Sequence, residues 1–487
     1  MYVAAVLLVT LLVVKISHWV YTWANPKCNG KLPPGSMGLP IIGETIQFFT
    51  PYSLYETQPF IKKRMARYGS VFRTNIAGQK VIVSTDPVTN YSIMNTENES
   101  LLFWCTDGLS HIFGNQNFLS QHGSVHKYLR SLVLHLTGRE ILRQKFLHEI
   151  DQTTRSHLHS WASSPGTVNV RDACAEMIFE SSAKKLISYD ESKYSKKLRQ
   201  NYRAFKLGIV SFPMYFPGFA FYDCIKGRKH IRKVIEDIYQ ERKATKVPGH
   251  DFLDRVLEEV EKENAVLNDS NAIDLLFVLL FAAFETVSQS ITLITKHLTD
   301  HPQVLAELTE EHEGIISRRE DENSEVTWEE YKSMTFTHMV INEIVRLANI
   351  IPVTFRKVLK DMELDGKLTI KYTHTHIRYT IPAGWVIMMV LPLVHFDADK
   401  YEDPLAFNPW RWKGKELHTG TKTFMGFGGG VRPCAGADFA KVHLAVYIHY
   451  LVTKYRWSVV KGGEVFKQPA LKFPNGLHVK IAEKHKI

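Results

Sequence analysis

The spacing of apolar residues predicts a mainly helical protein with a small β region. From Thr57 onward, most segments carry their apolar residues on one face of an amphipathic helix. Residues 71–76 and 80–84 alternate instead and read as a strand pair with a turn between them. Residues 358–389 also have strand character, with a Pro-Ala-Gly turn at 382–384. We therefore expect a mainly α fold with a small mixed β region.

The first 24 residues are predicted to be a transmembrane anchor. Residues 2–14 are apolar with one exception, and the apolar stretch continues to Trp23, which is long enough to cross a bilayer as a helix. A cleaved signal peptide is less favoured, because no basic residue precedes the apolar core and no small-residue cleavage site follows it. Lys27 and Lys31 come next, so the positive-inside tendency leaves the rest of the chain on the cytosolic side. The aromatic residues typical of a membrane interface are Trp19, Tyr21 and Trp23.

Residues 25–50 are predicted to be a stiff hinge. They contain Pro33-Pro34-Gly35, in which proline fixes φ and glycine permits a sharp bend. No linker and no internal repeat appears further along, so we expect residues 51–487 to form one folded domain.

Composition narrows the class of protein. Of the 487 residues, 45% are hydrophobic and 23% charged, which is too polar for a protein with many membrane spans. The five cysteines are far apart and include no Cys-x-x-Cys pair, which argues against a disulfide scaffold or a zinc ribbon and favours a reducing compartment. The net charge is +10, but no basic helix or arginine-rich run indicates nucleic-acid binding. A solvated surface, an anionic membrane face and an acidic partner remain as explanations of the charge.

One cysteine lies in a glycine-rich stretch that predicts a cofactor site. The stretch runs from Phe427 to Gly436 as Phe-Gly-Gly-Gly-Val-Arg-Pro-Cys-Ala-Gly, and its cysteine is Cys434. A thiolate is a strong ligand for haem iron, glycines let the backbone approach a flat macrocycle, and Arg432 can neutralise a propionate. The alternative is a buried structural cysteine in a turn.

A long apolar helix predicted over residues 274–297 has polar residues at its centre. Thr286 can hydrogen-bond the carbonyl of Ala282, one turn back, and the small residues before it leave room for a small molecule. Glu285 beside this alcohol makes a plausible proton-delivery pair. The alternative is a buried core helix in which the Glu-Thr pair is incidental.

A second charged motif is predicted to be buried. Glu343 and Arg346 are three residues apart on a helix with an apolar face, so their side chains can meet. Arg411 in the later Pro-Trp-Arg-Trp stretch can join them as a third member.

Together these residues resemble the cytochrome P-450 superfamily of haem-thiolate monooxygenases, from Pro33 to about Val479. The resemblance implies a cytochrome P-450 fold after the anchor, with Cys434 as the axial ligand of haem b. It implies that Glu285 and Thr286 activate dioxygen, and that the network of Glu343, Arg346 and Arg411 holds the structure behind the haem. The remaining haem contacts implied are Arg130, His126, Arg356, Arg432 and Phe427.

Within the superfamily the chain looks most similar to plant microsomal enzymes that oxidise sterols, brassinosteroids and triterpenoids. This likeness rests on residues 39–45, 327–334 and 407–412. It implies electrons from NADPH through NADPH–cytochrome P-450 reductase, an apolar substrate, contact with membrane lipid, and a place in the endoplasmic-reticulum membrane. Repeated oxidation ending in side-chain cleavage uses the same residues as a single hydroxylation. The expected substrate pocket is lined by Phe281, Ala282, Ile351, Val353 and Leu477.

Two other functions stay open from the sequence. One is a haem-thiolate isomerase or lyase that needs no dioxygen, against which the Glu285–Thr286 pair argues. The other is a membrane-tethered haem- or sterol-binding protein without catalysis.

The chain departs from the family pattern in three places. Ala283 stands where glycine is frequent, and His126 where many members have tryptophan. About a dozen residues, 367–378, precede the Tyr-x-Ile-Pro-x-Gly turn that relatives reach almost at once. We expect a surface extension of a β-hairpin, and retained intron sequence is the alternative.

Overall fold

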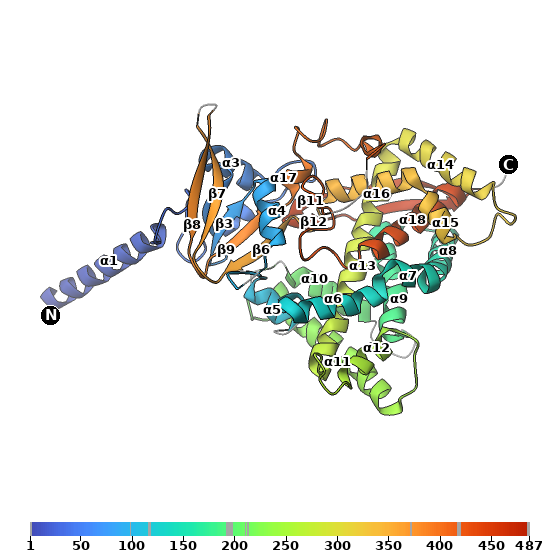
Figure 1. Cartoon of the computed structure of the whole chain (residues 1–487), viewed down its shortest axis with the longest axis horizontal. Coiled ribbons are helices and arrows are strands. Elements are labelled where there is room, and N and C mark those ends of the chain that lie inside the picture. The colour runs from blue at the N-terminus through green and yellow to red at the C-terminus, as the bar shows by residue number, and fades with distance from the viewer. Residues whose placement is uncertain are drawn as a thin grey trace.

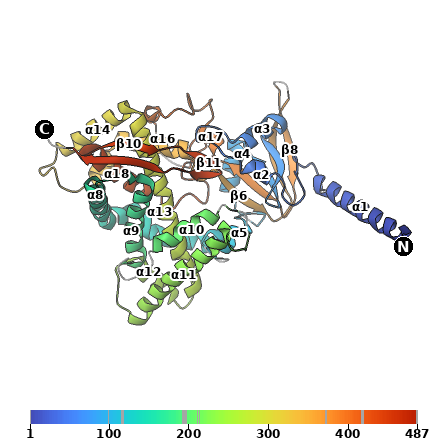
Figure 2. The same cartoon turned by 180° about the vertical axis from the view of Figure 1, so that it is seen from behind.

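The computed structural model describes residues 2–97, 99–114, 118–190, 198–209, 211, 214–370, 373–415 and 420–484. Helices make up most of it, and the strands of the largest sheet and of the β7–β8 hairpin gather at the end of the molecule from which the N-terminal helix α1 (Tyr2–Ala24) projects (Figure 1). The view from behind shows β10, which belongs to a separate sheet in the order β10-β13-β5, among the helices near the C-terminus (Figure 2). The predicted mainly α fold with a small β region is confirmed.

The helices differ widely in length, and the longest, α13, runs through the middle of the helical part (Figure 1). Their bounds are α2 Thr45–Phe48, α3 Pro59–Tyr68, α4 Pro87–Asn95, α5 Asp107–Phe113, α6 Gly123–Thr137, α7 Arg139–Ile141, α8 Leu147–Ser163, α9 Val170–Ile187, α10 Leu198–Ile209, α11 Ala220–Thr245, α12 Phe252–Val260, α13 Asp269–Asp300, α14 Pro302–Ile316, α15 Trp328–Ser333, α16 Thr335–Ala348, α17 Pro392–His395 and α18 Ala437–Lys454. A π-helix, Leu142–Phe146, joins α7 to α8, and 3₁₀ turns occupy Phe118–Ser120 and Pro409–Trp412.

The largest sheet has five strands in the order β2-β3-β9-β6-β4, and only the β3–β9 pair is parallel. The predicted strand pair at its edge is confirmed as β2 and β3. The strand bounds are β1 Tyr52–Ser53, β2 Val71–Ile76, β3 Gln79–Ser84, β4 Leu101–Phe103, β5 Val168–Asn169, β6 Val353–Val358, β7 Met362–Ile370, β8 Thr373–Ile381, β9 Val386–Val390, β10 Tyr455–Gly462, β11 Phe466–Gln468, β12 Ala470–Lys472 and β13 Leu477–Glu483.

The unusual segment 367–378 continues a β-hairpin. β7 and β8 pair antiparallel from Met362↔Ile381 to Ile370↔Thr373, so most of the extra residues extend the ladder. The base of this hairpin is tied to the hinge, because Thr380 N–H donates to the carbonyl of Lys31 over 2.9 Å. A hairpin extension can be accommodated at the surface without changing the sheet behind it.

Within the described residues, two helices are long and apolar enough to cross a membrane, but they differ in burial. The apolar window of α1 has no buried residues, whereas that of α13 is 72% buried within the protein. α13 is therefore a core helix, and α1 fits a membrane anchor. The hinge after α1 lies against the sheet, since Arg73 donates to the carbonyl of Pro33 (2.9 Å) and its backbone N–H donates to that of Pro34 (2.8 Å).

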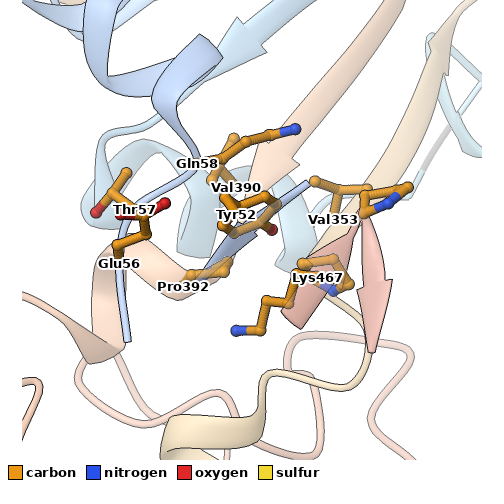
Figure 3. A pocket seen from close by; sticks show the side chains of 10 residues that line it. Tyr52, Glu56, Thr57, Gln58, Val353, Val390, Pro392 and Lys467 are labelled. Carbon is orange, nitrogen blue, oxygen red and sulfur yellow. The ribbon is translucent and has the colours of Figure 1, made fainter. Parts of the chain in front are cut away.

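A buried lysine lies in the core next to the C-terminal end of α16. Lys467 on β11 lies opposite Tyr52 of β1 and is only 1% exposed. Figure 3 shows its side chain in a small pocket with Tyr52, Val353, Val390 and Pro392, and Glu56 lines the same pocket. Its Nζ lies 3.5 Å from the carbonyl of Leu347, in the last turn of α16. Burial lowers the pKa of Lys467 to about 7.

We predict that Lys467→Met changes how stability depends on pH. The folded protein binds the Lys467 proton only below about pH 7, while an unfolded chain binds it up to about pH 10.5. The free energy of unfolding of the wild type should therefore rise with pH across this window, by at most about 1.4 kcal/mol per unit from this group. The variant should lack that rise and should be more stable near pH 7. Unfolding midpoints measured from pH 7 to 10 check this.

Lys480→Met, at an exposed position on β13, serves as the control and should keep the wild-type slope. Parallel pH profiles for wild type and Lys467→Met would show that Lys467 is charged when folded.

Candidate functional site

Backbone shape places Cys434 in a tight loop before α18. Gly428 and Gly430 have φ of +73° and +67°, a region that side chains disfavour. A Cβ on Gly430 would lie 2.0 Å from the carbonyl oxygen of Met94, so this position requires glycine. The Cys434 N–H donates to the carbonyl of Phe427 over 2.8 Å, which closes the loop.

The Cys434 side chain faces space inside the protein. Burial raises the pKa of its thiol, and the N–H of Gly436 and the charge of Arg130 oppose that rise. Its surface is nevertheless open, although the loop around it packs on the core through Phe427 and Ala435. Because Cys434 is surrounded by protein and still has accessible surface, its side chain lines a space inside the protein.

Two guanidinium groups meet beside this loop. Arg356 on β6 is 1% exposed, donates from Nη1 to the carbonyl of Phe355 (3.0 Å), and has an Nε without a partner in the described structure. Burial and repulsion by Arg432 lower the pKa of Arg356 to about 10. Phe103 lies against both groups, with its ring centroid 5.5 Å from the Arg356 Cζ and 4.9 Å from that of Arg432. A buried cation of this kind needs an anion.

α6 adds two more groups to the cationic side of the loop. Arg130 donates from Nη1 to the carbonyl of Pro433, next to Cys434 (2.5 Å). His126 is buried and stacks on Phe118, and burial together with Arg432 lowers its pKa to about 4. His126 is therefore neutral near pH 7 and can donate one hydrogen bond.

The centre of α13 also faces internal space. Ala282 is exposed although most residues of the helix are buried. The Thr286 hydroxyl donates to the carbonyl of Ala282 over 2.9 Å, as the sequence predicted. Such a bond loosens the helix at this turn and leaves the hydroxyl oxygen free to accept another hydrogen.

Glu343 and Arg346 are completely buried and paired. Arg346 donates to both carboxylate oxygens of Glu343 (2.8 and 2.9 Å), and Arg411 donates from Nε to Oε1 (3.1 Å). Trp412 Nε1 and the Asn408 N–H complete the shell of Glu343, each at 3.0 Å. The expected three-membered network is present, and the indole and the backbone donor extend it.

A neutral histidine links this network to the cysteine loop. His395 Nε2 accepts from the N–H of Met425 (2.9 Å), so the ring proton sits on Nδ1 and is donated to Asn349 Oδ1 (2.6 Å). Burial and the charge of Arg346 lower the pKa of His395 to about 3, in agreement with the neutral form. Its carbonyl also accepts from Arg346 (2.7 Å).

Comparison with known proteins identifies the family of this chain. The family model for Cytochrome P450 matches residues 33–481. This chain is a cytochrome P450. It is 50% identical over 96% of its length, and 89% of the relative's, to Cytochrome P450 87A3 of Oryza sativa subsp. japonica. It is 42% identical over 98% of both chains to the Cucurbitadienol 11-hydroxylase of Siraitia grosvenorii.

A solved structure confirms the fold. Retinoic acid bound cyanobacterial CYP120A1 superposes with a TM-score of 0.79, covering 94% of this chain and 100% of that one at 23% identity. The chain is thus an oxidoreductase of the P450 monooxygenase type, a family that binds haem and receives electrons from NAD(P)H through a reductase. Members of this family generally use redox partner proteins and hydrophobic substrates.

The residues of this cytochrome P450 fit a haem. Three features suit an iron-bearing, anionic macrocycle: an open thiol at the edge of internal space, a loop whose glycines allow close approach, and a buried arginine whose Nε has no partner within the described residues. Cys434 would hold the iron, and Arg356, Arg130 and His126 would face the propionates.

Glu285 lies on a different face of α13 from Thr286. Its carboxylate accepts hydrogen bonds from Arg171 (2.7 Å) and Gln289 (2.6 Å), and successive helix residues point about 100° apart. Burial raises the pKa of Glu285, and Arg171 opposes the rise. A carboxyl with a raised pKa holds its proton closer to neutral pH than an ordinary carboxyl does.

The other pocket candidates lie in three different places. Phe281 packs with Phe205 and Tyr202 next to Ala282, in an aromatic cluster. Ile351 is 64% exposed between α16 and β6, and Val353 lines the Lys467 pocket of Figure 3. Leu477 begins β13 and is 1% exposed in the main core. Of these, Phe281 and Ala282 are the pair that the structure brings to the Thr286 turn.

Sequence reasoning missed two acidic–basic partnerships, Arg171 with Glu285 and Glu97 with Arg432. The pairs are separated by 114 and 335 residues. No local spacing signals either contact, because both depend on how distant elements pack.

We predict that Glu343→Gln costs about 3–5 kcal/mol of unfolding free energy, because it leaves two arginines facing a neutral amide in a buried site. The cooperative unfolding midpoint of the full chain measures this. As a control, Glu329→Gln removes an exposed pairing with Lys332 and should cost less than about 1 kcal/mol. Equal, small losses for both variants would contradict the central role of Glu343.

Proposed function

We propose that this cytochrome P450 hydroxylates a triterpenoid or related sterol at an unactivated C–H bond. The observation that carries the proposal is the open Cys434 thiol inside the protein, beside a cluster of arginines. The similarity to a cucurbitadienol hydroxylase over nearly the whole chain supports the substrate class. The aromatic cluster beside Ala282, which includes Phe281, Phe205 and Tyr202, offers the apolar surface that a fused-ring skeleton needs.

In this proposal each group of residues has one task. Cys434 ligates the haem iron, and Arg356, Arg130 and His126 hold the propionates, with Phe427 and Arg432 in the loop beside them. When bound, haem supplies the chemistry that uses O₂ and two electrons to oxidise the C–H bond. The Glu343 network keeps the loop behind it in place.

Proton delivery is assigned to α13. The Thr286 hydroxyl donates to the Ala282 carbonyl, so its oxygen is positioned to accept a proton and pass one on. Glu285 rotates away from Arg171, takes up a proton from solvent and passes it on to the Thr286 hydroxyl; Arg171 is itself 14% exposed, so this side of Glu285 leads toward solvent. This keeps bulk water out of the reaction space while a proton still enters.

The cellular setting is also part of the proposal. Residues 1–24 anchor the chain in the endoplasmic-reticulum membrane, residues 25–50 form the hinge, and residues 51–487 form the catalytic domain on the cytosolic side. NADPH–cytochrome P450 reductase supplies electrons. The membrane lipid in which α1 lies also dissolves the apolar substrate.

We predict that the full chain, expressed with NADPH–cytochrome P450 reductase, adds one oxygen atom to a triterpene alcohol from a panel of tetracyclic and pentacyclic skeletons and sterols. Mass spectrometry and NMR identify the product and the carbon oxidised. Loss of side-chain carbons would indicate repeated oxidation. Cys434→Ala should give no product and should lose the far-red-shifted Soret band of the reduced, carbon-monoxide-bound form.

Three results would contradict the proposal in different ways. A rearranged product without added oxygen indicates an isomerase or lyase. A shifted Soret band without any product from the panel overturns the substrate class. Retention of the band in Cys434→Ala overturns the ligand assignment.

We predict that Thr286→Ala uncouples NADPH consumption from product formation, with the lost reducing equivalents appearing as hydrogen peroxide in solution. Removing one proton-transfer group typically costs about 10²–10⁴-fold in the assisted step. Product, NADPH and peroxide are measured in the same reaction. Thr292→Ala is the matched control, since Thr292 makes the same type of bond to Ser288 (2.7 Å) but is buried. Coupling should survive in the control, and equal coupling in both variants removes Thr286 from the relay.

A further inference from the structure

Glu97, two residues after α4, makes an ion pair with the arginine of the cysteine loop. Arg432 Nε donates to Glu97 Oε2 over 2.6 Å, and Nη2 donates to Oε1, so the pair is bidentate. The His122 ring also bonds Glu97 through Nδ1 (3.0 Å). Both charged side chains are about nine-tenths buried. A bidentate pair in such surroundings is among the strongest polar contacts that a protein makes.

The protonation of Glu97 agrees with this geometry. Burial alone would raise the pKa of its carboxyl, but the hydrogen bonds from Arg432 and His122 outweigh burial and lower the pKa to about 2. Glu97 is therefore a permanent negative charge beside the arginine cluster at neutral pH.

The donors of Arg432 are nearly all used within the protein. Besides its two bonds to Glu97, it donates to the backbone carbonyls of Gln121 (2.6 Å) and Leu119 (3.3 Å). Four of its five N–H groups are thus engaged. Arg356, by contrast, makes one hydrogen bond, to Phe355, and its Nε has no partner in the described part of the chain. Arg356 is the better free donor for an anion.

The same contacts fasten the cysteine loop to its surroundings. Arg432 lies two residues before Cys434, and its partners come from the segment after α4 and the segment before α6. The neighbouring Val431 N–H donates to the carbonyl of Met94 over 3.1 Å, so backbone and side chain hold the loop at the same place.

We propose that Glu97 is a positioning residue that holds Arg432, fastens the Cys434 loop to the segments around α4 and α6, and leaves Arg356 as the main propionate donor. The inference rests on the proposed haem ligation by Cys434. Glu97 acts on the haem only through Arg432. Its negative charge also offsets one of the arginines near the haem edge.

Two measurable consequences follow from removing this charge. A looser loop releases haem faster and loses thiolate ligation more readily. An uncompensated Arg432 makes the site more positive, which favours the ferrous over the ferric state and raises the midpoint potential. A residue that only stabilised the fold would change neither quantity in the folded, haem-loaded protein.

The test uses the full haem-loaded chain in detergent and compares Glu97→Gln, Arg432→Gln and the double variant. Haem transfer to apomyoglobin and the Fe(III)/Fe(II) midpoint potential are measured for each. We expect severalfold faster transfer and a more positive potential for Glu97→Gln. Adding this change to Arg432→Gln should have little further effect on haem transfer, since Arg432 is then no longer there for Glu97 to hold. Glu97→Asp, which keeps the charge, should restore the potential toward that of wild type.

Glu330→Gln is the matched control, because Glu330 makes an equally bidentate pair with Arg319 (2.6 and 2.8 Å). The inference is overturned if Glu97→Gln behaves like this control in both measurements, or if its effect on haem transfer adds in full to that of Arg432→Gln. If Glu97→Gln yields no folded protein, the comparison of the double variant with Arg432→Gln decides. Absence of the shifted Soret band in wild type would count against the proposed ligation, not against Glu97.

Discussion

The geometry of the site depends on the ion pairs that the fully buried carboxylate of Glu343 makes. This carboxylate is paired with Arg346 of its own helix and with Arg411 from a distant segment, and it accepts from Trp412 as well. Because an unpaired charge at this depth is very costly, moving these elements apart would destabilise the fold. Arg346 then reaches the carbonyl of His395, whose ring fixes Met425 just before the cysteine loop. A chain of hydrogen bonds thus connects the packing of α16 to the position of Cys434.

Other buried charges in the described structure are paired in the same way, and two buried cations, Arg356 and Lys467, are exceptions. Glu285 is held by Arg171, Glu97 by Arg432, and Asp274 by Arg228 and Arg232. Arg356 stands apart among the described residues, since it is deeply buried and only Glu97, through the Arg432 pair, places a negative charge near it. Lys467 is also buried and makes no ion pair within the described residues, but a lysine can avoid the cost by losing its proton, as its lowered pKa shows, and an arginine cannot. A buried arginine short of an anion therefore points to a ligand more strongly than a buried lysine does.

Local patterns explain which parts of the fold and the site were predictable from the sequence. The strand pair β2–β3, the Thr286 bond to Ala282 and the Glu343–Arg346 pair are all formed by residues within a few positions of each other. The glycine-rich loop is likewise local, since its φ angles depend on the residues in it. The partners of Glu285 and Arg432 lie 114 and 335 residues away, so only the packed fold brings them together. The same holds for the direction of the Glu285 carboxylate, which turns away from Thr286 because Arg171 of α9 is there to receive it. The family resemblance predicted that Arg356 and Arg130 contact haem. The packed structure shows how many donors of each arginine are already used within the protein.

The charged side chains around the cysteine loop have a net positive charge. Arg130, Arg356 and Arg432 contribute three positive charges, His126 is neutral, and Glu97 subtracts one, which leaves +2. Haem carries two propionates, so the net charge of this cluster equals in size the charge of the two carboxylates that it would face. Without Glu97 the cluster would hold one surplus positive charge, and a buried surplus costs stability and favours the added electron of the ferrous state. Since Arg432 spends most of its donors on the protein, it contributes charge more than hydrogen bonds, whereas Arg356 contributes both. Glu97 therefore determines the different roles of the two neighbouring arginines, although it bonds only to Arg432.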